Sequence, residues 1–207
     1  MISTIFTKRP RYYVSKNDYY ETIITENTNL KNIATDLDFV KNEDFKTEST
    51  ILFNNKLKLN STYNDIIECF GTPIHQLDKS SANQHSVLFY KKRVGTYKIR
   101  LEIHVVDRKF LIGFITFNLS SKSEKSSIID SISNKYQINI TKKYLEDFRI
   151  FNHKNEFIKV IDSVDLTLVY GEYSASKNQI IKNIADEKEL KYLSSDQKNK
   201  SLLHDNI

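Results

Sequence analysis

Residues 87–119 of this chain read VLFYKKRVGTYKIRLEIHVVDRKFLIGFITFNL, and this stretch decides the fold. It predicts strands over 87–92, 97–106 and 110–119, joined by turns at 93–96 and 107–109. In the middle strand four aliphatic side chains alternate with four polar ones: Ile99, Leu101, Ile103 and Val105 against Lys98, Arg100, Glu102 and His104. A period of two places one face of a sheet on the core and the other in water. We therefore expect a meander with a polar, solvent-facing side.

The segments around this meander predict a helix before it and a similar unit after it. The first helix, over 62–70, ends at Gly71, and Pro73 prevents its return before a polar loop over 74–86. A second helix over 124–136 is followed by predicted strands at 148–151, 157–161 and 164–170. The fold class expected is therefore α+β, with an antiparallel sheet built from two helix-plus-three-strand meander units and the helices on one face.

The chain is expected to divide into four consecutive parts. Residues 1–49 form an N-terminal helical segment, because apolar residues recur there at helical spacing, at Leu30, Ile33, Ala34, Leu37 and Val40. Residues 50–119 form the first helix–meander unit, which begins with a hairpin that turns at Asn54-Asn55. Residues 120–193 form the second unit with a C-terminal helix over 177–193, and 194–207 form a frayed polar tail.

Composition excludes several classes of protein. Of the 207 residues 39% are apolar and 12% aromatic, with only two prolines and four glycines, which argues against disordered and collagen-like chains. One cysteine excludes an internal disulfide framework and a multi-cysteine metal site. No apolar run approaches the roughly 20 residues of a membrane span. The N-terminus does not resemble a secretory signal, so we expect a cytoplasmic protein without a membrane partner.

The positive charge is concentrated in two stretches of the chain. The formal net charge is +5, but 8–16 holds four basic residues and no acid, and 79–109 holds eight basic residues against two acids. Removing these 12 basic and two acidic residues from the totals of 31 and 26 leaves a net charge of −5 elsewhere. Clustered charge steers an anionic partner more effectively than the net value indicates.

The sequence shows no organised catalytic group, metal site or cofactor site. Cys69 lies near the C-terminal end of its predicted helix, where the dipole disfavours a thiolate, and a packed inert thiol is expected. His75, Asp78 and His85 share the following loop, but their spacing matches no zinc-ligand pattern. No phosphate-binding glycine loop or serine-nucleophile motif occurs. An enzyme, if present, would use a pocket around Cys69 and the two histidines.

One module resembles a known fold. Residues 57–73, LKLNSTYNDIIECFGTP, followed by VLFY at 87–90, place a short helix ending in Gly-x-Pro before an aromatic strand. This is similar to the β-lactamase-inhibitor proteins and the small outer-membrane-assembly lipoproteins, over about 57–119 and, in element order, 124–170. The resemblance implies a non-catalytic, protein-binding sheet. Only Gly71, Pro73 and Tyr90 align, so it carries over no site residue. Secretion chaperones have a similar element order, and immunity proteins are similarly small.

These features favour a non-catalytic binding protein, such as an inhibitor, an immunity protein or a chaperone-like factor. The polar side of the meander would dock on a protein with an acidic surface. The residues expected to bind this partner are Tyr90, Lys92, Arg93, Tyr97, Lys98, Arg100 and His104, the tyrosines as aromatic anchors and the others as complementary charge. The alternative is a nucleic-acid-binding protein that uses Lys8–Tyr13 and the hairpin tip Lys91–Arg93 on phosphates.

Overall fold

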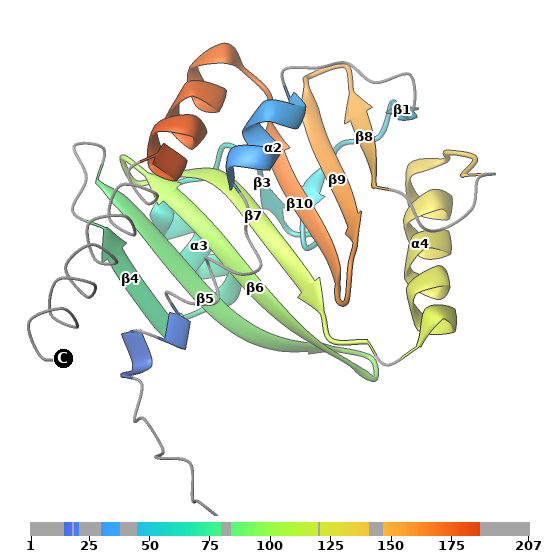
Figure 1. The fold of residues 1–207 in the computed structure, drawn as a ribbon, viewed down its shortest axis with the longest axis horizontal. Coiled ribbons are helices and arrows are strands. Elements are labelled where there is room, and N and C mark those ends of the chain that lie inside the picture. The colour runs from blue at the N-terminus through green and yellow to red at the C-terminus, as the bar shows by residue number, and fades with distance from the viewer. Residues whose placement is uncertain are drawn as a thin grey trace, which may run out of the picture.

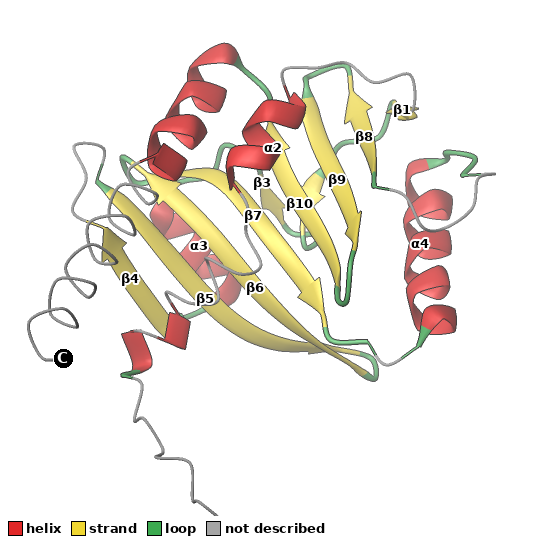
Figure 2. Ribbon diagram, in the orientation of Figure 1, coloured by secondary structure: helices red, strands yellow, loops and turns green. Residues whose placement is uncertain are grey.

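The protein has an α+β fold in which helices cover a large mixed sheet (Figures 1 and 2). The computed structural model describes residues 15–17, 19–20, 30–37, 45–79, 84–119, 121–140 and 147–186. The helices are α2 (Leu30–Leu37), α3 (Tyr63–Phe70) and α4 (Lys122–Tyr136), with a further helical stretch over 175–186. The strands are β1 (Phe45–Thr47), β2 (Leu52–Phe53), β3 (Leu57–Lys58), β4 (His75–Lys79), β5 (His85–Val94), β6 (Tyr97–Val106), β7 (Lys109–Phe117), β8 (Phe148–Asn152), β9 (Glu156–Asp162) and β10 (Leu166–Glu172).

Eight strands form one sheet in the order β1-β8-β9-β10-β7-β6-β5-β4, and β2 and β3 pair separately. The contact between β7 and β10 joins the two halves of the chain, with Leu166 opposite Phe117. The expectation of a wholly antiparallel sheet is wrong, because β1 pairs with β8 in parallel. The two strands are separated in the chain by β2–β7, α3 and α4, so the connection is long enough for a parallel pair.

The sheet is covered on both faces, so the expectation that the helices share one face is also wrong. On the first face, the hairpin β2–β3, α3 and α4 pack on the sheet in the larger hydrophobic cluster. On the second face, α2 and the 175–186 helix pack on β7, β9 and β10 in a separate cluster. Strand β7 explains this arrangement, because Ile115 belongs to the first cluster and Phe114 to the second. A strand that is apolar on both sides requires cover on both sides.

Local signals explain why α3 and α4 begin where they do. Thr62 caps α3 and accepts from the backbone of Asp65, whose carboxylate accepts in return from the Thr62 backbone. Ser121 and Glu124 form the same reciprocal box at the start of α4. Each box satisfies two backbone donors that a helix start otherwise leaves unpaired. The hydrogen bonds that the Asp65 carboxylate accepts from Thr62, first from its backbone and then from its side chain, lower the pKa of the Asp65 carboxyl.

Two strands differ from the expectations, and three expected features cannot be compared with the described residues. Residues 75–79, expected in a loop, form the edge strand β4 against β5, and β1 was not expected. Leu77 packs there with Tyr20, Val87 and Phe89 in a small cluster on the second face. The basic stretch 8–13, Val40 and the tail 194–207 lie outside the described residues.

The hairpin β5–β6 projects beyond its neighbours at one end of the sheet (Figure 1). Its pairing with β4 stops at Phe89, whereas β5 and β6 stay paired as far as Val94 and Tyr97. Gly95 takes a positive φ of 57° at the first of two turn residues, where a tight hairpin favours glycine. The predicted polar stretch therefore extends beyond β4 on one side, whereas on the other side β6 stays paired with β7 as far as Ile99.

Candidate functional site

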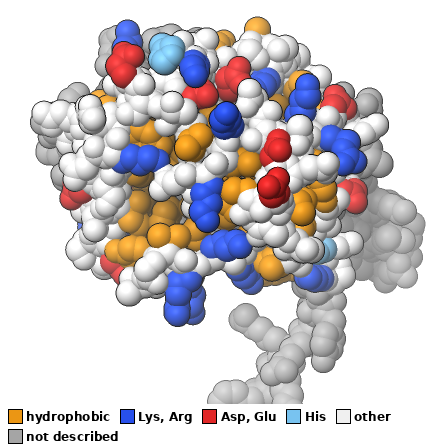
Figure 3. All heavy atoms as spheres, turned by 180° about the vertical axis from the view of Figure 1, so that it is seen from behind, with side chains coloured by type: hydrophobic (Ala, Val, Ile, Leu, Met, Phe, Trp, Pro, Cys, Tyr) orange, Lys and Arg blue, Asp and Glu red, His pale blue; other side chains and the backbone are white. Residues whose placement is uncertain are grey.

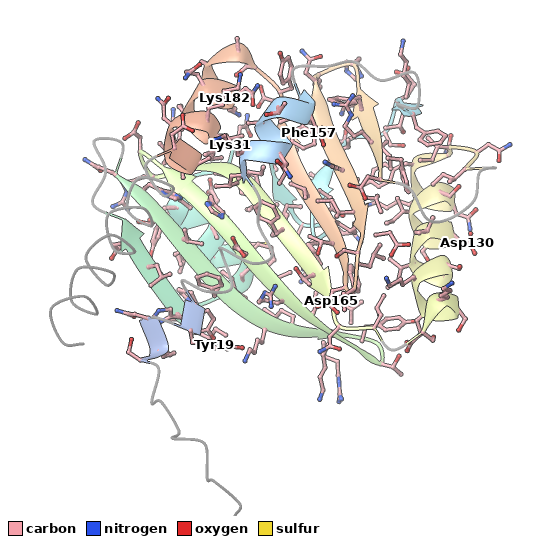
Figure 4. The ribbon with its side chains drawn as sticks, in the orientation of Figure 1. Tyr19, Lys31, Asp130, Phe157, Asp165 and Lys182 are labelled. Carbon is pink, nitrogen blue, oxygen red and sulfur yellow. The ribbon has the colours of Figure 1, made fainter. Side chains whose placement is uncertain are left out.

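Four cations lie on one side of the projecting hairpin. Lys91 is directly opposite Arg100 in the register, and Arg93 is directly opposite Lys98. Directly opposite residues have side chains on the same face, and so do residues two apart in a strand. We call Lys91, Arg93, Lys98 and Arg100 the cationic cluster; it lies on the second face of the sheet. Figure 4 shows nitrogen-tipped side chains that project near this end of the sheet.

Two hydrogen bonds fix the backbone orientation within the cluster. The carbonyl of Phe89 accepts from Ile74 N at 2.9 Å, on the side of β4, and the carbonyl of Lys98 accepts from Asn118 N at 3.3 Å, on the side of β7. Backbone groups of successive strand residues alternate in direction, so the N–H and C=O of Lys91 and Arg93 point away from β6. Both like-charge pairs are therefore non-hydrogen-bonded pairs, the type in which opposing side chains approach most closely.

Among the described residues no carboxylate forms an ion pair with the cluster; Glu102, the next residue after Arg100 on this face, contacts His104 instead. Lys91, Arg93 and Lys98 are exposed, and none of them has a side-chain hydrogen bond or ion pair within that part of the chain. Arg100 is half-buried; its Nη2 donates to Thr116 Oγ1 at 3.4 Å, and its buried Nε has no described partner. Like charges directly opposite each other in a sheet destabilise it. The hairpin therefore carries an electrostatic cost that an anionic partner would relieve.

The remaining expected site residues do not join this cluster. Tyr90, Lys92 and Tyr97 lie on the first face, because they alternate with the cluster along the same two strands. The expectation that Tyr90 is a surface anchor is wrong: it is only 2% exposed and packs on Phe70, with 5.6 Å between ring centroids. Burial, followed by the nearby Tyr63 and Cys69, raises the pKa of Tyr90 to about 12. Lys92 Nζ donates to the carbonyl of Phe70 at 3.1 Å, at the C-terminal end of α3.

Tyr97 is half-buried and contributes to an apolar surface on the first face. Its ring lies edge-on to Phe117, with 6.5 Å between centroids, and Leu119 is also partly buried against the same cluster. Val94, opposite Tyr97 in the register, is 48% exposed. Figure 3 views this face and shows hydrophobic side chains gathered on it, with Lys and Arg side chains among and below them. The hairpin end thus has a cationic side and an apolar side.

The expectation that His104 lies on a solvent-facing surface is wrong. His104 is 1% exposed and Glu102 2%, because this part of the second face is enclosed by the protein itself. His104 Nε2 lies 2.8 Å from Glu102 Oε1, and His104 Nδ1 lies 3.0 Å from Nε2 of the buried His85. The two imidazoles stack at 18°, with 5.2 Å between centroids. Polar alternation in β6 therefore marks a buried hydrogen-bonded network as well as an exposed end.

The geometry of this Glu102–His104–His85 network fixes its proton arrangement. With Glu102 ionised, His104 Nε2 carries the proton that it donates to the carboxylate. If His104 is neutral, its Nδ1 accepts, and His85 Nε2 must donate to it. Protonation of both rings would set two donors against each other and break the contact. Its burial keeps the network from a partner surface.

The cysteine and histidines proposed for an enzyme pocket do not converge. Cys69 is half-buried on α3, against the cluster on the first face. His75 stacks on Tyr20, with 4.5 Å between centroids, in the small aromatic group on the second face that includes Phe89. Burial, then the nearby Lys16 ammonium, lowers the pKa of His75. Within the described ranges no group of three or more His, Cys, Asp or Glu side chains could hold a metal ion.

A polar cavity of about 410 Å³ lies between α2 and the ends of β9 and β10. Asp36, Asp147 and Asp165 line it together with Lys159, which is 5% exposed and ion-paired to Asp36. Asp165, labelled in Figure 4, lies in the turn before β10, whereas Asp36 lies on α2, the helix that carries Lys31. Asp36 and Asp147 balance the buried Lys159, and this internal pairing accounts for much of the polar lining.

Comparison with protein-family models, curated proteins and solved structures gives no match. The resemblance to β-lactamase-inhibitor-like modules therefore stays a prediction. Among the described residues, no helix is long and apolar enough to cross a membrane. The cationic cluster is the site to which the chain's own geometry points, and sequence reasoning identified three of its four members. Lys91, the fourth, was expected only as part of the hairpin tip in the nucleic-acid alternative, and the strand register places it opposite Arg100.

Proposed function

We propose that this protein is a non-catalytic intracellular binding factor that docks on an acidic protein surface through the cationic cluster. An inhibitor, immunity or chaperone-like role fits this activity. The observation that carries the proposal is the register: Lys91 opposite Arg100 and Arg93 opposite Lys98, without a described counter-charge. The four cations repel one another at an exposed hairpin end, and carboxylates of a bound partner would offset this repulsion by attracting them.

The arrangement favours a protein partner over single-stranded nucleic acid. Binders of single strands combine cations with aromatic rings on which bases stack. Here Tyr90 is buried and Tyr97 faces the opposite side of the sheet from the cluster. The succession of α3 with β4–β7 and of α4 with β8–β10 supports the idea of two related helix–meander units, which we propose as part of the same protein-binding architecture.

Charge reversal tests the proposal. Wild-type protein and the variants Arg93→Glu and Lys98→Glu are used as bait in native lysate, with and without nuclease. Lys154→Glu is the matched control, because Lys154 is exposed at the β8–β9 turn and the substitution changes net charge equally. We expect a nuclease-resistant protein partner that both cluster variants lose and the control keeps. Equal recovery by all variants refutes the cluster as the docking surface, and loss of every partner with nuclease favours the nucleic-acid alternative.

A further inference from the structure

Within the part of the chain that the structure describes, no strand covers the outer edge of β5 beside the cationic cluster. Strand β4 pairs with residues 85–89 only, and Ile74 N, which reaches the Phe89 carbonyl, is the next group along. Beyond this point Pro73 has no N–H to offer, and no described strand pairs with β5 on this side. The backbone N–H and C=O of Lys91 and Arg93 point outward along this edge, as the alternation from Phe89 requires.

Edge protection alone does not account for the charges. Lysines on an open strand edge commonly prevent pairing with other chains, and Lys91, Lys92 and Arg93 would suffice for that purpose. Arg100, however, lies on β6, which is paired with β5 on one side and β7 on the other. A cation on an inner strand does not protect an edge from pairing. Arg100 instead repels Lys91 and increases the positive charge that a strand beside β5 would face.

We propose that the partner binds by strand addition: an extended segment pairs with the β5 edge at Lys91–Arg93 and carries carboxylates at two positions two residues apart. This inference rests on the proposed function and names the partner's recognition element. Residues of an added strand that lie opposite Lys91 and Arg93 share their face, so acidic side chains there meet the cationic cluster. The residue between them lies on the first face, directly opposite Lys92 and diagonal to the exposed Val94. Because the Lys92 ammonium donates to the Phe70 carbonyl, this residue meets the aliphatic stem of Lys92 and Val94, which favours an apolar side chain. The recognition pattern is acidic–apolar–acidic.

The test separates the backbone contribution from the charge. Lys91→Pro removes the outward N–H as well as the charge, whereas Lys91→Gln removes the charge alone. The bonds to β6 remain in both variants, because the Lys91 N–H points outward, and proline is tolerated at such edge positions. Arg93→Pro and Arg93→Gln form a second pair if the first proline does not fold. Circular dichroism and urea unfolding confirm that each full-length variant is folded.

The probe is a fluorescent nine-residue peptide in which glutamate alternates with valine, compared with a peptide of the same composition whose glutamates are contiguous. Affinities come from fluorescence anisotropy. We expect Lys91→Pro to bind the alternating peptide about five- to tenfold more weakly than Lys91→Gln, the loss of about one backbone hydrogen bond. We also expect the wild-type protein to prefer the alternating peptide.

Three results overturn the inference. Equal affinities of each proline and glutamine variant exclude strand addition, as does equal binding of the two peptides. If oligothymidine displaces the labelled alternating peptide at a lower concentration of negative charges than the unlabelled peptide does, the site is a nucleic-acid groove instead. The proposed function is judged separately: if Arg93→Glu and Lys98→Glu still lose the nuclease-resistant partner, docking through the cluster stands although strand addition fails.

Discussion

Replacing Lys98 by glutamate should stabilise the protein while it weakens partner binding. The substitution turns the Arg93–Lys98 repulsion into an attraction. Two unit charges about 5 Å apart in water interact by about 0.8 kcal/mol. The Debye length of about 8 Å at physiological salt reduces this to about 0.4 kcal/mol. Reversing the sign of one charge therefore raises the free energy of unfolding by about 0.8 kcal/mol, within the range measured for cross-strand pairs.

Urea unfolding followed by circular dichroism measures this change, and thermal unfolding should show a rise of about 2–3 °C for a chain of this size. Lys98→Gln, which removes the repulsion without adding attraction, should give about half the effect. Lys154→Glu controls for the change of net charge from +5 to +3. At 1 M salt, where the Debye length is about 3 Å, the gain should fall to about 0.3 kcal/mol. A Lys98→Glu variant no more stable than Lys154→Glu would refute the argument from register.

Four further substitutions test the fold around the site by urea unfolding. Thr62→Ala removes the cap that binds the Asp65 amide and should cost about 1 kcal/mol, with little change at Lys98-dependent binding. His104→Ala deprives the buried Glu102 carboxylate of its N–H donor and should cost about 3 kcal/mol, whereas Glu102→Gln keeps an acceptor and should cost less. The pKa of His75 is lower in the folded state than in the unfolded chain, so the unfolded chain takes up a proton first as the pH falls. The free energy of unfolding should therefore decrease as the pH drops below about 6.5. His75→Gln removes this group and should lessen the decrease between pH 7 and 5.

The sequence predicts the elements of the central sheet better than their environment. Alternation in 97–106 matches the bounds of β6, Tyr97–Val106. The same alternation predicted that His104 is exposed to solvent, and this prediction is wrong. A polar face of a sheet is exposed only where no other part of the protein covers it. The neighbours of His104 come from other strands: His85 stacks on it from β5, and Phe114 meets it edge-on from β7. No local pattern reports that His104, Glu102 and His85 satisfy one another.

A signal of two-sided burial was nevertheless present in the sequence. Residues 109–117 are apolar at nearly every position, and β7 is buried from Phe110 to Thr116. A central strand without a polar side requires helices on both faces, which contradicts the expected single helical layer. The parallel pairing of β1 had no such signal, since a three-residue strand is too short to show periodicity.

The position of the cationic cluster follows from where the core ends. Along β6, exposure falls from the half-buried Tyr97 to 3% at Ile99 and 0% at Leu101. Repulsion between Arg93 and Lys98 therefore opposes only the pairing of the hairpin end, whereas the Lys91–Arg100 pair, two residue pairs further in, acts beside the buried Ile99 and Leu101, where the core begins. Opening of a strand end costs less than global unfolding, so a projecting hairpin can retain unfavourable charge at small cost to the fold. Strand addition at Lys91 and Arg93 would then stabilise the part of the sheet that has the least support of its own.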